Sequence, residues 1–418
     1  MDTPRPGLLR VATAGSVDDG KSTLLGRLLH DAKGVFADQL AAVATASERR
    51  GGPAAALDLS LLTDGLRAER EQGITIDVAY RYFASPRRSF VLADTPGHVQ
   101  YTRNMVTGAS TADVALVLVD VRRGVTEQSR RHAAIAALLR VPHLVLVVNK
   151  MDLVGWDRTA YARVAVEFGA WAQRLGIGDV LAVPVSALHG DNVVTASELA
   201  GWWAGPTLLE HLETVAAGPP PTGSLRFPVQ YVIRPPEQDY RGYAGRVAGG
   251  TVRPGDQVVV LPAGIRTAVA AVETYDGPLE SADEGRSVVL RLADDVDVGR
   301  GDLLAPAADP PVPTRAFEAT VCWLAEEPLG PRRYLLKHTT RTSRAVVEAT
   351  GVLDVATAAV DPADGLGLND IGRVRVRATD AVALDDYAVN RRTGAFLLLD
   401  EASGATVAAG MAGPLPWR

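Results

Sequence analysis

The segment 15–22 constrains the fold more than any other part of this 418-residue chain. Its sequence, GSVDDGKS, has the spacing G-x-x-x-x-G-K-[ST], in which glycines let the backbone curl around phosphate oxygens. An apolar run at 8–14 precedes it and a helical pattern at 23–30 follows it. This strand-loop-helix context turns backbone N–H groups and the positive end of a helix toward an anion. The sequence therefore predicts a phosphate-binding loop in which Lys21 contacts the β- and γ-phosphates and Ser22 binds Mg²⁺.

A second motif, DTPG at 94–97, ends the apolar run 90–93. A carboxylate at the carboxyl edge of a strand that faces a phosphate loop is placed to hold Mg²⁺ through water, and we assign this role to Asp94. Gly97 can bring its backbone N–H close to a γ-phosphate because it has no side chain. An ordinary Pro-Gly turn is the alternative interpretation, and the phosphate loop upstream argues against it.

Two further motifs identify the base. NKMD at 149–152 follows the apolar run 143–148, and Ser186, Ala187 and Leu188 follow the run 180–185. Asp152 offers two acceptor oxygens that match the ring N–H and the exocyclic amine of guanine, whereas adenine presents the wrong pattern. A backbone N–H of the SAL segment can contact the guanine oxygen. In this order after a phosphate loop, the motifs predict a site for GTP rather than ATP.

The charged segment 63–77 lies between the phosphate loop and Asp94. Most of 67–71 fits the solvated face of a short helix. The segment 73–75, GIT, differs because it starts an alternating strand pattern over 74–83. We expect the Thr75 hydroxyl to meet Mg²⁺ and the γ-phosphate, so that this loop is held by GTP and released on hydrolysis.

These motifs together resemble the translation-factor class of GTPases. Within that class, Asp19 stands where elongation factors usually carry His. The stretch DGLRAEREQGITIDVAYRYF at 64–83 is similar to the large, GTPase subunit of bacterial heterodimeric sulfate adenylyltransferase, or ATP sulfurylase, of the CysN type. SALHGDNVV at 186–194, GPTLLE at 205–210 and NRRTGAF at 390–396 resemble later signatures of the same family. The resemblance thus spans nearly the whole chain.

The resemblance also implies a set of site residues. His98, directly after Gly97, matches the family's water-orienting His, which aligns a nucleophilic water with the γ-phosphorus and with Lys21 and Thr75 forms the predicted catalytic set. Val17 and Ile74 match an apolar pair that screens this His in related factors. Ser22, Thr75 and Asp94 are the predicted Mg²⁺ ligands, Asp94 through water. The predicted GTP-binding residues are Gly15, Ser16, Val17, Asp18, Asp19, Gly20, Lys21, Ser22, Thr23, Asp94, Gly97, Asn149, Lys150, Asp152, Ser186, Ala187 and Leu188.

The implied activity is GTP hydrolysis coupled to the reaction ATP + sulfate → adenylylsulfate + pyrophosphate. The chain has no second phosphate loop and no S-G-G-x-D or H-x-G-H stretch of the kind that binds ATP for adenylyl transfer. That step is therefore expected in a small partner subunit holding ATP and sulfate, and two such heterodimers could assemble further. Since the chain stops at Arg418, the adenylylsulfate kinase of some relatives is not expected. A translational GTPase of the elongation factor Tu type and a GTP-gated adaptor are the alternatives.

The composition of the chain excludes several other classes of protein and of binding site. The net charge is −6 and no run is rich in Lys or Arg, which argues against extended nucleic-acid binding. Cys322 is the only cysteine, which excludes an internal disulfide and a thiolate metal cluster. No apolar run has membrane-spanning length and residues 1–10 lack a signal-like core, so a cytoplasmic chain without membrane association is expected. His143, His189 and His338 have no companion at metal-ligand spacing, and we interpret them as structural.

The order of apolar runs, helical patterns and Pro-rich breaks along the chain predicts an α/β P-loop GTPase domain followed by two all-β barrel domains. Apolar strands alternate with helical stretches up to about residue 212, the pattern of a mainly parallel sheet covered on both faces. The Pro-rich linker at 218–223 then precedes short strands at 227–233, 243–248, 257–261 and 287–292. The expected domains are 1–217, 218–310 and 311–418. A single large sandwich is the alternative for the region after the linker.

Overall fold

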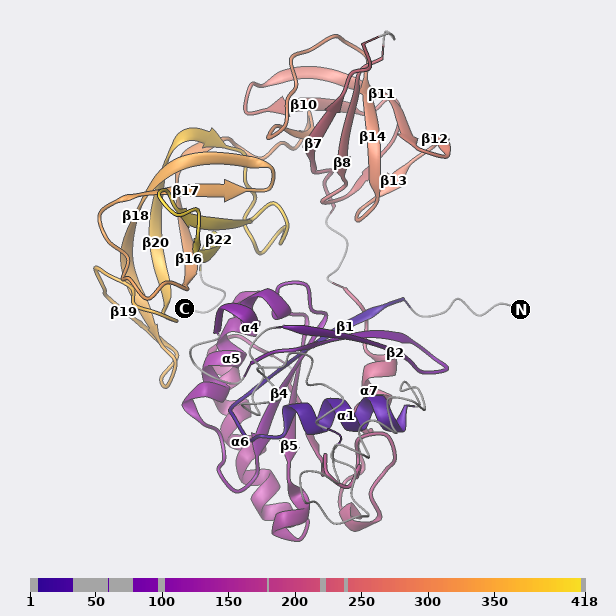
Figure 1. Cartoon of the computed structure of the whole chain (residues 1–418), viewed down its shortest axis with the longest axis vertical. Coiled ribbons are helices and arrows are strands. Elements are labelled where there is room, and N and C mark those ends of the chain that lie inside the picture. Colours follow the sequence, from indigo (N-terminus) through magenta and orange to yellow (C-terminus); the bar gives the residue numbers. More distant parts are fainter. Residues whose placement is uncertain are drawn as a thin grey trace. The chain divides into compact units, whose positions relative to one another are not determined.

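The structure is a computed structural model, and it describes residues 7–32, 59, 78–96, 102–178, 180–218, 223–236 and 240–414. The chain divides into two compact units. One consists mainly of the residues up to 219, and the other mainly of the residues from 220 onward. The first unit is an α/β layer structure and the second is all β (Figure 1).

A six-stranded sheet forms the centre of the first unit, in the order β2-β3-β1-β4-β5-β6. All neighbours pair in parallel except β2, which is antiparallel to β3 at one edge. The strands are β1 (Leu9–Gly15), β2 (Ala79–Ala84), β3 (Ser89–Asp94), β4 (Val114–Asp120), β5 (His143–Asn149) and β6 (Val180–Pro184). The central β4 is buried along its whole length, because helices cover both faces of a parallel sheet.

Helices pack on both faces of this sheet. Leucines of α1 and α7 join the apolar side chains of β1, β3 and β4 in one core cluster. In Figure 1, α4, α5 and α6 lie on the other side of the sheet. The helices are α1 (Lys21–Asp31), α4 (Thr102–Ala109), α5 (Glu127–Leu138), α6 (Arg158–Arg174) and α7 (Leu208–Thr214). None of the helices within the described ranges is long and apolar enough to cross a membrane.

Local sequence explains where these helices begin. The Thr126 hydroxyl accepts from the backbone N–H of Ser129 at the start of α5, and the Asp157 carboxylate accepts from Thr159 and Ala160 at the start of α6. Such side chains satisfy N–H groups that have no partner within the helix. The helix α1 begins differently, because its N-cap is Gly20 and no side chain caps it. Its first N–H groups therefore remain free of a side-chain cap.

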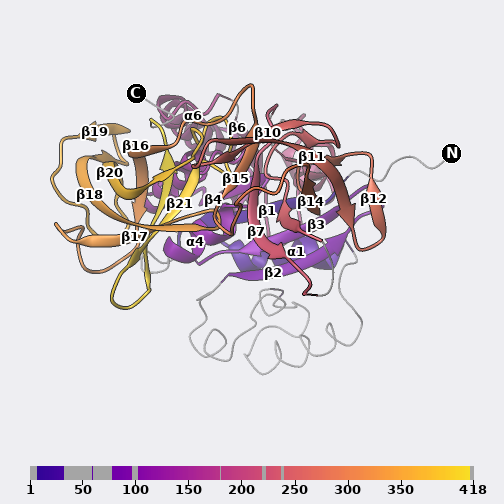
Figure 2. The ribbon, with the colours of Figure 1, turned by 90° about the horizontal axis from the view of Figure 1, so that it is seen from above.

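The second unit contains two closed barrels. The first has the strand order β10-β15-β7-β8-β14-β11-β12, and an additional β10–β11 pairing closes it. The second has the order β17-β21-β22-β16-β20-β18-β19 and is closed by β17–β18; its strands curve around one another in Figure 2. Closure satisfies the backbone groups that edge strands would leave unpaired. The sandwich alternative is therefore wrong, and the expectation of two barrels is confirmed.

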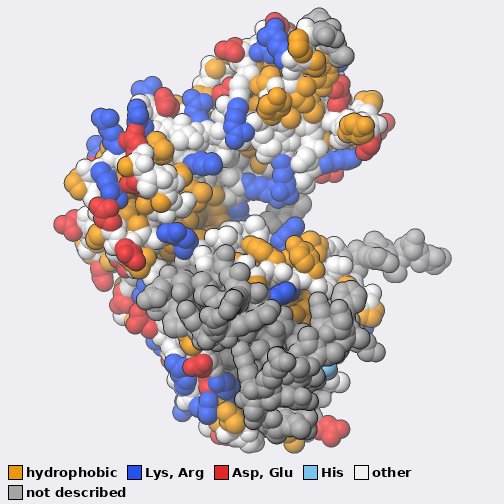
Figure 3. Space-filling view, in the orientation of Figure 1, with side chains coloured by type: hydrophobic (Ala, Val, Ile, Leu, Met, Phe, Trp, Pro, Cys, Tyr) orange, Lys and Arg blue, Asp and Glu red, His pale blue; other side chains and the backbone are white. Residues whose placement is uncertain are grey.

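The strand bounds of the barrels follow the turn signals of the sequence. The first barrel contains β7 (Phe227–Ile233), β8 (Gly242–Arg246), β10 (Gln257–Leu261), β11 (Ile265–Thr274), β12 (Gly277–Leu279), β14 (Ser287–Leu292) and β15 (Leu303–Pro306), with β9 (Thr251–Val252) and β13 (Ala282–Asp283) pairing beside it. The second contains β16 (Thr314–Trp323), β17 (Arg333–His338), β18 (Arg341–Asp354), β19 (Ala359–Asp361), β20 (Ile371–Val382), β21 (Ala395–Asp400) and β22 (Thr406–Ala412). Acidic and basic side chains are interspersed on the face of this unit seen in Figure 3.

An ion pair joins the two barrels within the second unit. Nε of Arg226 donates to Oδ2 of Asp385 at 2.9 Å, its Nη2 donates to Oδ1 at 2.9 Å, and both side chains are nearly buried. The Thr393 hydroxyl donates to the same carboxylate at 2.5 Å, and Nδ2 of Asn390 donates to the carbonyl of Ala248 at 3.0 Å. The NRRTGAF signature at 390–396 therefore contributes to the barrel interface.

Candidate nucleotide site

The loop between β1 and α1 turns where only glycine fits. Gly20 has φ +93°, and a Cβ atom there would lie 2.4 Å from Nδ2 of Asn149. Gly15 has φ +145°, and a Cβ atom there would lie 2.8 Å from the Leu118 carbonyl oxygen. Asp18 also has positive φ, which is uncommon for a residue with a side chain. The two motif glycines thus allow the curled backbone that the sequence predicted.

Side chains from the loop itself and from α5 form hydrogen bonds that stabilise this curled backbone. The backbone N–H of Ser16 donates to Oδ2 of Asp19 at 2.6 Å, and that of Gly15 donates to Nδ1 of His132 at 3.0 Å. Nζ of Lys21 donates to the carbonyls of Gly15 and Ser16 at 3.1 and 2.9 Å, which keeps the ammonium over the loop. Burial lowers the pKa of Lys21, and the nearby carboxylates of Asp94, Asp19 and Asp18 oppose this shift.

His132 is a residue that sequence reasoning missed. It lies on α5, is fully buried, and burial lowers its pKa to about 3, with the positive charge of Lys21 acting in the same direction. The ring is therefore neutral, and because Nδ1 accepts from Gly15 the proton resides on Nε2. Nε2 of Gln128 lies 2.7 Å from Nε2 of His132, and turning the Gln128 amide over by 180° places its oxygen there to accept that proton. A polar pair four residues apart on a buried helix face was the only signal in the sequence.

Oxygen-bearing side chains line the carboxyl edge of β1 and β3. Asp94 is buried at the end of β3, and the Thr13 hydroxyl donates to its Oδ1 at 3.2 Å. The Thr95 hydroxyl donates to the Thr13 carbonyl. Ser22, in the first turn of α1, is partly exposed. Hydroxyl and carboxylate oxygens are the ligands Mg²⁺ prefers, so this donor set fits the predicted ion.

Asn149 connects three of the predicted motifs. Its Nδ2 donates to the Asp19 carbonyl of the phosphate loop at 2.8 Å, and its Oδ1 accepts from the Ala187 N–H of the SAL segment at 2.9 Å. The neighbouring Lys150 donates from Nζ to the Asp18 carbonyl. The structure therefore brings the phosphate loop, NKMD and SAL together in one place, as the sequence predicted.

Asp120 orients Lys150. Its Oδ2 lies 3.1 Å from Nζ of Lys150 and 2.6 Å from Nη2 of Arg122. Burial would raise the pKa of Asp120, but the hydrogen bonds from Arg122 and Lys150 outweigh it and hold that pKa well below its ordinary value. Asp120 ends β4 and pairs in register with Asn149 of β5. The sequence analysis did not assign it a role, although a carboxylate at a strand's carboxyl end was a usable signal.

The predicted base-contacting residues form the other end of the site. Asp152 lies on a short 3-10 helix (Met151–Val154) and is partly exposed, with its Oδ2 3.9 Å from Nε2 of His189. Ser186 is buried and its hydroxyl accepts from the His189 N–H at 3.3 Å. Leu188 is 56% exposed, and Arg27 of α1 donates to its carbonyl.

Several predicted residues fall elsewhere. Thr75, Ile74, Gly97 and His98 lie outside the described residues. His338 is buried in the second unit and contacts the Thr393 carbonyl at 2.7 Å through Nε2. Within the described ranges, no group of three or more His, Cys, Asp or Glu side chains is arranged to hold a metal ion.

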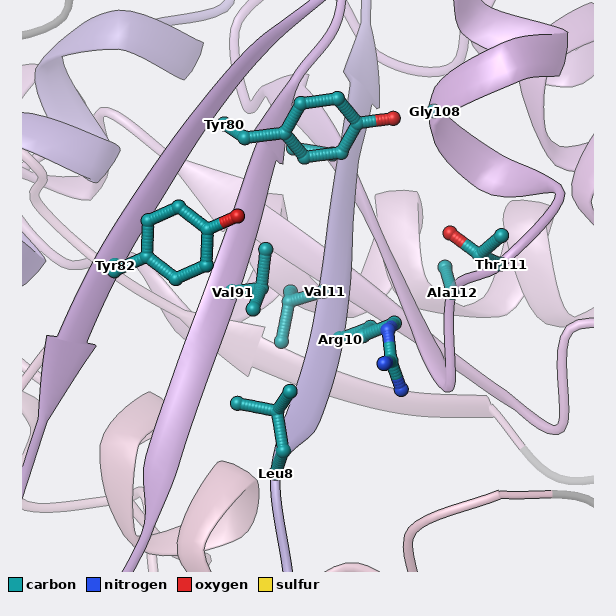
Figure 4. Close-up of a pocket in the computed structure, with 10 residues that line it drawn as sticks. Leu8, Arg10, Val11, Tyr80, Tyr82, Val91, Gly108, Thr111 and Ala112 are labelled. Carbon is teal, nitrogen blue, oxygen red and sulfur yellow. The ribbon is translucent and has the colours of Figure 1, made fainter. Parts of the chain in front are cut away.

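A separate cavity of about 260 Å³ opens at the other end of β1. In Figure 4, Tyr80 and Tyr82 of β2 face Leu8 and Arg10 across this cavity, and the ring of Tyr80 extends toward the end of α4. None of the predicted nucleotide-binding residues lines it. The cavity is therefore distinct from the candidate site, which is an open cradle of backbone groups.

Comparison with known families agrees with this geometry. Residues 7–217 match the model of the elongation factor Tu GTP binding domain, and residues 316–412 match the GTP-eEF1A C-terminal domain-like model. The fold and site thus define a P-loop GTPase of the translation-factor class. A crystal structure of sup35 complexed with GMPPNP is 23% identical, with a TM-score of 0.43, covering 98% of this chain and 95% of that one.

Relatives of known sequence place the chain more narrowly. Sulfate adenylyltransferase subunit 1 of Cellvibrio japonicus is 49% identical over 407 residues, which are 97% of this chain and 86% of the relative. The corresponding subunit of Salmonella typhimurium is 48% identical, covering 98% and 86%. The bifunctional enzyme CysN/CysC of Mycobacterium tuberculosis is 56% identical, covering 97% of this chain and 67% of that enzyme. The chain belongs to the sulfate adenylyltransferase subunit 1 (CysN) family.

Proposed function

We propose that the chain is the GTP-hydrolysing subunit of a two-chain sulfate adenylyltransferase. In this proposal a small partner subunit binds ATP and sulfate and transfers the adenylyl group, while this chain hydrolyses GTP. The reaction so driven is ATP + sulfate → adenylylsulfate + pyrophosphate. The relatives are named subunit 1, which supports the existence of a second subunit. We place the pair in the cytoplasm, where ATP and GTP are supplied. We also propose that the chain consists of a GTPase domain at 1–217 and two barrel domains at 218–310 and 311–418.

The junction made by Asn149 supports the GTP-binding part of this proposal. One side chain bonds both the phosphate loop and the SAL segment, so groups for phosphate and groups for a base are held in one frame. Asp152 adds acceptor oxygens that suit guanine. We assign GTP contacts to the predicted motif residues within this frame.

The local geometry supports the roles assigned to Lys21, Ser22 and Asp94, and the sequence motifs alone support those assigned to Thr75 and His98. Lys21, held over the loop by two carbonyls, is placed to exchange them for phosphate oxygens. Ser22, Asp94 and Thr75 are assigned to Mg²⁺, which when bound would stabilise charge that develops on the phosphate oxygens. His98 is assigned to orienting the attacking water, a role of positioning more than of base catalysis.

In this proposal, the subunit serves to couple GTP hydrolysis to the adenylylation of sulfate. Sulfate is a weak nucleophile and the phosphosulfate anhydride is high in energy, so adenylylation of sulfate runs uphill. GTP hydrolysis in the same complex can displace that equilibrium if a two-state element connects the sites. We assign this element to the segment around Thr75, which GTP would order and GDP would release.

The test is the yield of adenylylsulfate from the reconstituted pair. With the small subunit, ATP and sulfate present, GTP should raise the yield above its GTP-free value, and GDP or a non-hydrolysable GTP analogue should not. Thr75→Ala should abolish the gain while sparing much of the GDP binding. Equal yields with all three nucleotides would refute the sulfate-activation role and leave a GTPase without an assigned partner reaction.

A further inference from the structure

One carboxylate oxygen in the phosphate loop has no hydrogen-bond partner. Oδ1 of Asp19 is buried and unbonded, while Oδ2 accepts from the Ser16 N–H at 2.6 Å. The whole residue is 1% exposed. A buried carboxylate with an unmatched oxygen is costly unless a cation offsets its charge. In the nucleotide site proposed above, the same charge would also repel phosphate oxygens.

Two cations face this carboxylate. Lys21 is one, but its Nζ already donates to two loop carbonyls, and the proposed function requires it for phosphate. Arg123 is the other: its Nη1 lies 4.0 Å from Oδ1 of Asp19 and donates to the Val17 carbonyl at 3.2 Å. Arg123 comes from the connection between β4 and α5, so it approaches the loop from outside.

The neighbouring Arg122 serves a different carboxylate. It pairs with Asp120 at 2.6 Å and shares that group with Lys150. Of these two neighbouring arginines, Arg123 is the one that contacts the phosphate loop. Its side chain is 49% exposed, which leaves it room to move toward Asp19 from the present 4.0 Å.

We propose that Arg123 is a positioning residue of the phosphate loop, which offsets the charge of Asp19 and fixes the Val17 carbonyl so that the loop accepts a phosphate chain. The inference rests on the proposed GTP site. Asp19 in turn holds the Ser16 N–H and, through its carbonyl, the Asn149 side chain. Arg123 therefore acts on the phosphate site through Asp19 rather than by contact with the phosphates.

A double-mutant cycle on the full chain tests this role, with the dissociation constant of GDP as the readout. Arg123→Gln should weaken GDP binding by about tenfold, the scale of one charge-assisted interaction. Arg123→Lys should recover part of the loss because it keeps the charge. In an Asp19→Asn background, where no charge needs offsetting, Arg123→Gln should change the affinity by less than about threefold.

Controls separate this role from general damage. Arg130→Gln removes the same charge from α5, where Arg130 pairs with Glu167 at 2.7 Å, and should leave GDP binding at the wild-type value. Thermal unfolding without nucleotide identifies any variant that fails to fold. If Arg123→Gln does not fold, the GDP affinity of Arg123→Lys is compared with that of the wild type instead. An equal loss in both Asp19 backgrounds, or no loss in either, would overturn the proposal. Failure of the wild-type chain to bind GDP would instead refute the nucleotide site itself.

Discussion

The imidazole Nδ1 of His132 accepts a hydrogen bond from the backbone N–H of Gly15 at 3.0 Å. Both groups are buried, so no water replaces this bond if it is lost. The contact ties the interior face of α5 to the first residue of the phosphate loop. The position of α5 is therefore coupled to the shape of the proposed nucleotide site, although no residue of α5 belongs to a predicted motif.

We expect His132→Ala to destabilise the first unit by about 1–3 kcal/mol, because it leaves the Gly15 N–H without an acceptor and opens a cavity. Nucleotide affinity should fall with it, since the loop loses one of its supports. Thermal unfolding and GDP titration measure the two effects. His143→Ala, at the start of β5 and away from the loop, is the control and should leave GDP affinity near the wild-type value.

The pH dependence of stability should contain two opposing contributions. The folded-state pKa of His132 is about 3, below its ordinary 6.5, so the unfolded state binds more protons between these values and stability is lost as pH falls. Burial raises the pKa of Asp19 from 3.8 to about 6, so the folded state binds more protons in that window and stability is lost as pH rises. Urea unfolding between about pH 5 and pH 7 should show stability falling as pH rises for His132→Gln, where only the Asp19 contribution remains, and a steeper rise with pH for Asp19→Asn. Unchanged profiles would contradict these protonation states.

Asp152→Asn should change the base preference of the site. The amide donor complements the 2-oxo group of xanthine and cannot accept from the guanine amino group, so GTP should bind about tenfold more weakly or worse while xanthosine triphosphate gains. Competition binding between the two nucleotides measures the change. An unaltered preference for GTP would remove Asp152 from the site.

His98→Ala should separate hydrolysis from binding. If His98 orients the attacking water, its loss should slow GTP hydrolysis by roughly 10² or more and leave GTP affinity near the wild-type value. Lys21→Ala is the contrasting variant, because it should weaken nucleotide binding itself. Normal hydrolysis by His98→Ala with the partner subunit present would assign water positioning to another group.

Arg226→Ala should loosen the barrel interface. The change leaves the Asp385 carboxylate nearly buried without its bidentate partner, and removing one member of such a pair costs about 3–5 kcal/mol. Arg344, whose partner Glu401 is also at the surface, offers the matched control, and Arg344→Ala should unfold like the wild type. Denaturant unfolding of both variants gives the comparison. Similar midpoints for the two would show that the buried pair contributes little.

Much of the α/β unit could be predicted because its signals are local. The sequence predicts a buried strand at 114–120 and a helix at 127–139, and β4 and α5 match these ranges to within a residue, since burial on both faces and helix caps leave signals in the sequence. The phosphate loop, NKMD and SAL segments also lie together, because the carboxyl ends of parallel strands share one edge. His132 and Arg123 could not be assigned from the sequence, because their roles arise from contacts between segments about 100 residues apart. Asp120 carried a signal as a carboxylate at the end of a strand, but its pairing with Asn149 depends on strand register.

Asn149 gives the proposed site a property that neither of its ends would have alone. A base that fits poorly beside Asp152 would shift the SAL segment, and the Asn149 side chain would transmit that shift to the Asp19 carbonyl of the phosphate loop. In the proposed site, this linkage would increase selectivity for guanine, because a wrong nucleotide would also bind its phosphates more weakly. The same linkage would make nucleotide release cooperative, because the base and the phosphates would have to dissociate together.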